Sequence, residues 1–92
     1  MEISMTTREP KEPTFISILG RAFNILEQLL MSEDPIGISE LSRKTGIPKA
    51  NTFRIVKTLE DLNAITPEGS GYVLGNKMIE LGAGAKKNNQ FL

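Results

Sequence analysis

The segment Gly46-Ile47-Pro48 constrains the fold more than any other, because it must end one helix and begin another. Glycine readily adopts the left-handed conformation that closes a helix, and proline is tolerated in the first turn of the next one. Upstream, Ser39 is suited to cap a helix that runs to about Thr45, and Glu40 lies in its first turn, where the helix dipole favours an anion. The sequence therefore predicts two helices joined by a tight turn.

The helix after this turn is predicted to span about residues 48–63 and to be amphipathic. Its mainly apolar residues recur every three or four positions, which places them on a single face of the helix that packs against the core. The buried face comprises Thr52, Ile55, Val56, Leu59 and Leu62, and the N-terminal half of the other face comprises Lys49, Ala50, Asn51, Phe53, Arg54 and Lys57. The exposed half is therefore basic and polar, with one aromatic side chain.

Further patterns flank this pair of helices. A helix of about four turns is predicted upstream, with Ser17 as its cap. Its apolar stripe comprises Leu19, Ala22, Phe23, Leu26, Leu29 and Leu30. Residues 36–38 are predicted to be short and extended. Downstream, residues 64–66 and 71–74 surround a Pro/Gly/Ser turn and predict a hairpin. Tyr72 is predicted to pack under this hairpin, and contact with DNA is the alternative for its side chain.

One more helical segment is predicted from Asn76. Met78, Ile79 and Leu81 form its apolar stripe, its two glycines weaken it, and residues 85–92 are expected to fray. The predicted fold class is mainly α with a small β-hairpin, a winged helix-turn-helix. We expect a flexible N-terminal tail at residues 1–13, a winged helix-turn-helix domain at 14–75, and a linker helix with a C-terminal tail at 76–92.

The charge of the chain is balanced overall but uneven along the sequence. Eleven Lys and Arg residues balance eleven Asp and Glu residues, yet the interval from Leu41 to Thr58 contains five cations and no acid. Because these cations lie on two helices joined by a tight turn, one helix can enter a major groove of DNA while the other contacts the backbone. A solvated polar face is the alternative interpretation of this basic pattern.

Individual side chains of the helix at 48–63 suit different contacts with DNA. Asn51 is suited to pair with adenine and Arg54 with guanine, whereas Lys49 and Lys57 are suited to phosphates. Phe53 either reaches a thymine methyl or a sugar, or packs on the first helix or the hairpin. The same charges would serve a helix that docks on an acidic protein. A winged-helix protein–protein interaction module without sequence-specific DNA binding is therefore the alternative function.

The chain contains no cysteine and no histidine. This composition excludes disulfides and the usual zinc sites, and the scattered carboxylates form no recognisable catalytic arrangement. We therefore expect no cofactor, no metal site and no enzymatic activity. The apolar runs are too short to span a membrane, and residues 1–13 lack the apolar core of a secretory signal, so we expect a cytoplasmic protein.

Three separated segments, LGRAFNILEQL, ISELSRKTGIPKANTFRIVKTLEDLNAI and GYVLGNKMIELG, resemble the DNA-binding domain of the IclR family of transcriptional regulators. The resemblance covers about residues 16–84. It implies a winged helix-turn-helix that binds palindromic double-stranded operators as a dimer, followed by a linker helix and a larger effector-binding domain. An effector is therefore expected only if a further C-terminal domain exists. Whether the chain is a fragment or a natural short form stays open.

The resemblance also implies roles for individual residues. Arg21 matches a first-helix arginine that is placed to meet phosphate, and Ser39 matches the serine that caps the second helix. The full set of candidate DNA-binding residues is Arg21, Ser39, Lys49, Ala50, Asn51, Phe53, Arg54 and Lys57. Three features depart from the family pattern: Ala50 replaces a serine, Thr52 replaces an apolar residue, and the segment 68–71 lacks an arginine.

A homodimer is predicted on physical grounds as well. The core that a chain of 92 residues can form is marginal, and the stripe at residues 78–81 has no predicted partner within the chain. We expect the sequence-specific DNA-binding domain of a transcriptional regulator, most readily a repressor, with the helix at 48–63 in the major groove.

Overall fold

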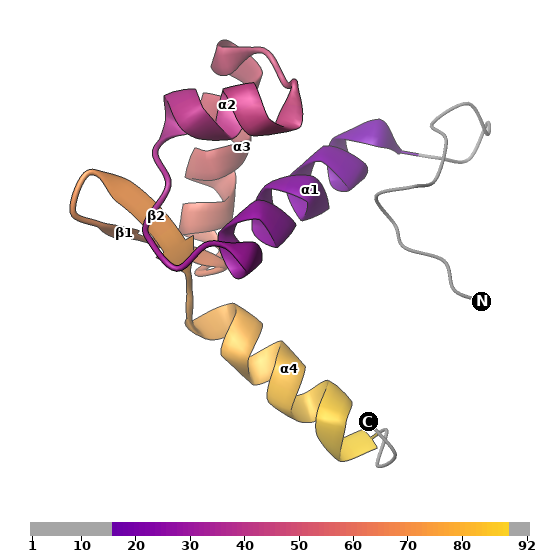
Figure 1. The fold of residues 1–92 in the computed structure, drawn as a ribbon. Helices are drawn as coiled ribbons and strands as arrows, with labels where there is room; N and C mark the ends of the chain where they lie inside the picture. Colours follow the sequence, from indigo (N-terminus) through magenta and orange to yellow (C-terminus); the bar gives the residue numbers. More distant parts are fainter. Residues whose placement is uncertain (1–15, 89–92) are drawn as a thin grey trace.

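A computed structural model describes residues 16–88 of the chain. In these residues it contains four helices and one antiparallel hairpin (Figure 1). The elements are α1 (Ser17–Met31), α2 (Ile38–Thr45), α3 (Lys49–Asp61), β1 (Ile65–Glu68), β2 (Gly71–Leu74) and α4 (Asn76–Asn88). This order and arrangement confirm the predicted winged helix-turn-helix. The flexible tail predicted at residues 1–13 lies outside the described residues.

The helix-turn-helix consists of α2 and α3. Gly46 has a φ of 77°, so it closes α2 in the predicted left-handed conformation. The predicted cap of α2 is wrong: Gly37 occupies the N-cap position, and its carbonyl accepts the Leu41 amide at 2.9 Å. Ser39 is therefore already inside the helix and makes no capping bond. Pro48 is the N-cap residue of α3, so this helix begins one residue later than predicted.

The core lies between α1, the helix-turn-helix and the hairpin. It comprises Ile25, Leu26, Leu29, Ile36, Leu41, Ile47, Ile55, Val56, Leu59, Ala64 and Ile65. On α3 the predicted buried face is confirmed except for Leu62, which is 58 % exposed. This residue follows the last turn of the helix as its C-cap. Its side chain therefore no longer follows the helical period of the buried face.

The buried face of α1 differs from the predicted stripe. Ile25, Leu26 and Leu29 are buried, whereas Leu19, Phe23 and Leu30 of the predicted stripe are exposed. The face of α1 that contacts the core includes Ile25 and is narrower than the predicted apolar stripe. Leu19 and Leu30, at the margins of the stripe, therefore stay at the surface. The predicted Ser17 cap is also wrong, because Ile16 is the N-cap residue and no side chain caps the helix.

The hairpin forms the wing of the fold. Ile65 pairs with Leu74 and Glu68 with Gly71, so a two-residue turn connects the strands. Ile36 adds an isolated antiparallel bridge to Tyr72, so the segment predicted to be extended at residues 36–38 is confirmed at Ile36 and Gly37 but wrong at Ile38, the first residue of α2. A Cβ at Gly71 would lie 2.8 Å from the Ile36 amide nitrogen, so this close approach requires glycine. The half-buried Tyr72 packs against the core, as predicted.

The last helix extends away from the other elements (Figure 1). It continues through both glycines to Asn88, so the fraying predicted from residue 85 is wrong as far as the described residues reach. Its start is tied to the end of α3, because the Lys77 amide donates to the Asn63 carbonyl at 2.9 Å. Met78 packs against the core, whereas Ile79 and Leu81 are 67 % and 59 % exposed. Of the predicted stripe, Met78 alone has a partner among the described residues.

Candidate nucleic-acid interface

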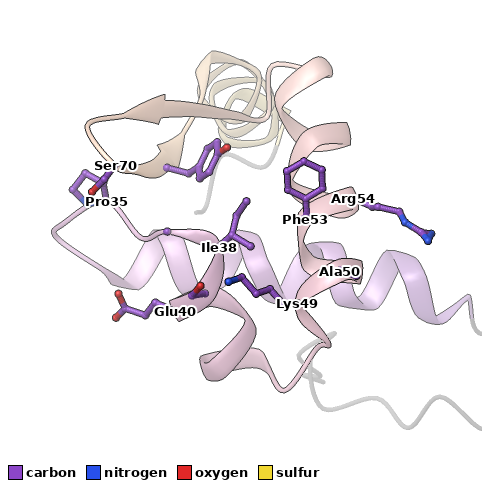
Figure 2. Close-up of a pocket in the computed structure, with 11 residues that line it drawn as sticks. Pro35, Ile38, Glu40, Lys49, Ala50, Phe53, Arg54 and Ser70 are labelled. Atoms are coloured by element: carbon purple, nitrogen blue, oxygen red, sulfur yellow. The ribbon is translucent and has the colours of Figure 1, made fainter.

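An open cleft lies between the N-terminal half of α3 and the wing. Figure 2 shows that α3, the start of α2 and the hairpin all contribute side chains to it. The lining residues are Pro35, Gly37, Ile38, Ser39, Glu40, Lys49, Ala50, Phe53, Arg54, Ser70 and Tyr72. The cleft depends on the tight turn at Gly46, which returns the chain so that α3 passes beside the start of α2.

The structure brings five of the eight candidate residues to this cleft: Ser39, Lys49, Ala50, Phe53 and Arg54. Asn51 is half-buried and Lys57 is exposed on α3, but neither lines the cleft. Arg21 is exposed on α1, outside the lining of the cleft. The candidates therefore form one group around α3, with Arg21 apart from it.

The aromatic side chain of α3 is half-exposed. Phe53 has an exposed fraction of 50 %, and Figure 2 shows its ring on the side of α3 that faces the cleft. Phe53 therefore lies outside the buried core, and both its contact with DNA and its packing on α1 or the hairpin stay predictions. The Lys57 ammonium lies 6.0 Å from the ring centroid. A cation at this distance is attracted to the face of an aromatic ring. Phe53 thus offers an apolar surface to a ligand in the cleft.

The cations of the helix-turn-helix fall into two groups. Lys57 forms an ion pair with Glu60 at 3.1 Å, and Lys44 forms a longer one with Glu40 at 3.8 Å. No ion pair to Arg43, Lys49 or Arg54 is present within residues 16–88. These three cations are therefore more available to an external anion than Lys44 and Lys57. The acids that neutralise the paired cations lie just outside the acid-free interval of the sequence.

Glu60 also affects the protonation of Lys57. The hydrogen bond from the ammonium to the Glu60 carboxylate, together with the charge of that carboxylate, raises the pKa of Lys57. Lys57 thus already has an anionic partner on the same helix. Its ammonium has three N–H donors, so it can also contact a phosphate, but Glu60 neutralises part of the charge that attracts that phosphate.

Arg54 lies at the border of two surfaces. It lines the cleft, yet Figure 2 shows its guanidinium extending away from the hairpin. On that side it borders an apolar groove of about 300 Å³ between α1 and α3, to which Leu19 and Leu62 also contribute. The stem of an arginine can cover apolar surface while its charged head stays in solvent. Arg54 is therefore held beside α3 with its donors exposed.

Several cleft residues were not predicted as functional. Pro35, Gly37, Ile38, Ser70 and Tyr72 reach the cleft from segments before α2 and from the wing. Serine and tyrosine hydroxyls can contact phosphates, but all five residues lie outside the basic interval of the sequence, and the pairing of Ile36 with Tyr72 brings the two segments together. The wing itself adds no cation, because residues 65–74 contain Glu68 and neither lysine nor arginine.

Other classes of site find no support in the described part of the chain. Residues 16–88 contain no group of three or more His, Cys, Asp or Glu side chains that could hold a metal ion. No helix among them is both long enough and apolar enough to cross a bilayer.

Comparison with known proteins identifies close resemblances. The IclR helix-turn-helix domain matches residues 18–69. The HTH-type transcriptional regulator KdgR of Dickeya chrysanthemi is 38 % identical over 80 residues, which cover 85 % of this chain and 26 % of that protein. KdgR of Escherichia coli (strain K12) is also 38 % identical over 80 residues, covering 85 % of this chain and 30 % of that regulator.

A solved structure has the same fold. The IclR family transcriptional regulator from Brucella abortus superposes with a TM-score of 0.81 at 24 % sequence identity. The match covers 96 % of this chain and 36 % of that one. The chain thus spans about a third or less of the length of these relatives.

Proposed function

This chain belongs to the IclR family of helix-turn-helix transcriptional regulators, and we propose that it recognises a specific double-stranded DNA operator with α3 in the major groove. DNA-binding regulation of transcription follows from the family. Sequence specificity is our proposal, and one observation carries it: on the N-terminal half of α3, Lys49, Arg54 and the half-exposed Phe53 line the cleft, and neither cation forms an ion pair within residues 16–88.

In this proposal, the side chains of α3 make different kinds of contact with DNA. Lys49 contacts a phosphate, because it is exposed and forms no ion pair within residues 16–88. Asn51 and Arg54 contact base edges, since an amide suits adenine and a guanidinium suits guanine. Phe53 contacts a thymine methyl or a sugar from the cleft. Lys57 adds a weaker phosphate contact, because Glu60 neutralises part of its charge.

Three further candidate residues position the chain on the duplex. Ser39 at the first turn of α2 and Ala50 line the cleft, where a DNA strand would pass. Arg21 on α1 contacts phosphate at a distance from the cleft. Phosphate contacts of this kind set register and orientation but carry no sequence information themselves.

The regulator acts as a homodimer on a palindromic operator in this proposal, and it works as a repressor in the cytoplasm without enzymatic activity. The exposed Ile79 and Leu81 on the extended α4 support dimerisation. Residues 14–75 form the DNA-binding domain, and residues 76–92 form the linker helix and tail. An effector would act only through a further C-terminal domain.

Selection from a random duplex library tests the proposal. The wild-type chain should enrich a two-fold symmetric sequence and bind it at least about a thousandfold more tightly than a scrambled duplex, as specific DNA-binding proteins do. Equal affinity for selected and scrambled DNA would contradict sequence-specific recognition. Absence of DNA binding, combined with binding to an acidic protein, would instead favour the protein-interaction module.

A further inference from the structure

Two hydroxyl groups from different helices converge on one backbone carbonyl in the turn of the helix-turn-helix. Ser42 on α2 donates its hydroxyl to the Ile47 carbonyl at 2.6 Å. Thr52 on α3 donates to the same carbonyl at 3.2 Å and also lies 3.1 Å from the Pro48 carbonyl. We refer to the Ser42 and Thr52 hydroxyls with the Ile47 carbonyl as the hydroxyl clamp.

The hydroxyl clamp satisfies a carbonyl that neither helix supplies with a backbone donor. Ile47 lies after the end of α2 and before Pro48, the N-cap of α3. Ile47 is 5 % exposed and Thr52 is fully buried, so water has little access to the Ile47 carbonyl. A carbonyl oxygen has two lone pairs, and leaving a buried one without a donor is costly. One hydroxyl from each helix therefore supplies a hydrogen-bond donor to the buried Ile47 carbonyl.

The clamp also links the orientation of α3 to that of α2. Both hydroxyls must stay within hydrogen-bonding distance of a single oxygen atom, which limits rotation of one helix against the other. The remaining bonds of the turn are more local: the Thr45 hydroxyl donates to the Leu41 carbonyl at 2.7 Å, within α2. The clamp therefore joins the two helices through side chains where the other turn contacts do not.

We propose that Ser42 and Thr52 are positioning residues for DNA recognition. The clamp holds α3 so that its base-reading side chains reach the groove while Arg43 and Lys44 on α2 reach the backbone. Without it, nonspecific attraction between cations and phosphates persists, but base contacts and backbone contacts no longer form together. This inference rests on the proposed sequence-specific binding and assigns a use to the fully buried hydroxyl of Thr52.

Four variants test the positioning role. Ser42→Ala and Thr52→Val each remove one hydroxyl, and the double variant leaves the Ile47 carbonyl without either donor. Thr52→Ser restores the hydroxyl and should restore specificity. Thr58→Val is the matched control, because the Thr58 hydroxyl donates at 2.9 Å to the Arg54 carbonyl within α3 and bridges no helices.

The measurement is the ratio of affinities for the duplex selected by the wild-type chain and for a scrambled duplex. Titrations are made at several salt concentrations, at a temperature where circular dichroism shows every variant to be folded. Each single variant should lower the ratio about twofold to threefold, and the double variant should lower it at least about tenfold, because contacting groups are coupled. Binding to the scrambled duplex and its salt dependence should stay at the wild-type level.

Two results would overturn the positioning role. The first is an equal loss of affinity for both duplexes, which would show that the hydroxyls only maintain folding. The second is an unchanged ratio in the folded double variant, or the same fall in the Thr58→Val control. Failure of the wild-type chain to select any sequence would refute the proposed function itself and is therefore distinguishable from either result.

Discussion

At the residue scale, Lys57 differs from the other cations of α3 because it already has an anionic partner. Its ammonium is bound to Glu60 and lies over the ring of Phe53. Lys49 and Arg54 lack such a partner within residues 16–88. Glu60 thus neutralises part of the charge that would attract a phosphate to Lys57. Its removal should convert Lys57 into a stronger DNA contact.

We predict that Glu60→Gln raises the affinity of the chain for all duplexes. If Lys57 gains one phosphate contact, the slope of log K against log salt concentration should steepen by about 0.9. Fluorescence anisotropy at several salt concentrations measures both effects. Glu80→Gln is the matched control, because the Lys77–Glu80 pair at 3.3 Å has the same spacing but lies on α4. An equal effect of both changes would mean that only the net charge matters.

Arg54 and Lys49 should separate base reading from phosphate binding. Arg54→Ala is predicted to weaken the selected operator by about 1–3 kcal/mol and to relax preference at one base pair. Lys49→Ala should instead weaken operator and scrambled duplex by similar factors, since a phosphate contact is independent of sequence. Lys57→Ala should behave like Lys49→Ala, with a smaller loss because Glu60 shares its charge. Titration of both duplexes decides between these roles.

Should Arg54→Ala reduce binding to both duplexes equally, Arg54 contacts only phosphate. The titration is a genuine test of base reading, because the guanidinium of Arg54 extends away from the hairpin (Figure 2). Base reading would then rest on Asn51 and Phe53.

At the scale of elements, the wing contributes shape more than charge. Glu68 is exposed at the end of β1, next to a turn without cations. We predict that Glu68→Lys increases affinity for operator and scrambled DNA alike, because it replaces repulsion from phosphates by attraction. Glu80→Lys on α4 makes the same change in net charge and should have a weaker effect. A change in base preference with Glu68→Lys would indicate that the wing reads sequence directly.

Gly75, between the wing and α4, and Gly82, within α4, have different roles. A Cβ at Gly75 would lie 2.7 Å from the Asn63 carbonyl oxygen, so Gly75→Ala should destabilise the fold by about 1–3 kcal/mol through overpacking. Gly82 in α4 has no atom within 4 Å of such a Cβ, so Gly82→Ala should stabilise the helix by about 0.5–1 kcal/mol. Urea denaturation followed by circular dichroism measures both changes. The same sign for both substitutions would contradict this account of the glycines.

At the scale of the whole molecule, apolar side chains remain uncovered. On α1 and α4 these include Leu19, Leu30, Met31, Ile79 and Leu81. Large apolar residues that remain exposed on an element extending from the domain suit contact with a second copy. The proposed homodimer would cover at least the α4 residues.

We predict that Ile79→Glu shifts the dimer to monomer, because it places a charge in the proposed interface. Sedimentation velocity over a range of concentrations measures the change. Affinity for a full palindrome should fall, while affinity for a single half-site stays near the wild-type value. In the wild type, half-sites about 34–36 Å apart, or a multiple of this distance, should bind best. A wild-type chain that remains monomeric at high concentration and on operator DNA would contradict the dimer.

Much of the architecture could be predicted from the sequence because its signals are local. Gly46 ends α2 through its own backbone conformation, and the period of Ile55, Val56 and Leu59 identifies the buried face of α3. The hairpin follows from two short apolar stretches around a turn. Three matching segments in order also identified the family before any tertiary contact was known. Each of these signals acts over a few residues or is carried by sequence similarity.

Predictions that depended on packing were less accurate. Leu19 and Leu30 extend the apolar stripe of α1, yet they are exposed because the neighbouring elements cover only a narrower face. Ser39 has the side chain of a cap, but Gly37 starts the helix, and a helix boundary two residues earlier removes that role. Neither the exposure of these leucines nor the earlier start of α2 follows from the local sequence pattern.

The sequence by itself thus determined the elements, their order and the concentration of cations around the helix-turn-helix. Only the tertiary structure decided which side chains share the cleft, which cations are neutralised by Glu40 and Glu60, and which hydroxyls meet at the Ile47 carbonyl. The physical reason is the separation along the chain over which each interaction acts. Backbone preferences and helical period act between near neighbours, whereas side-chain contacts between elements depend on the angles and distances at which those elements pack.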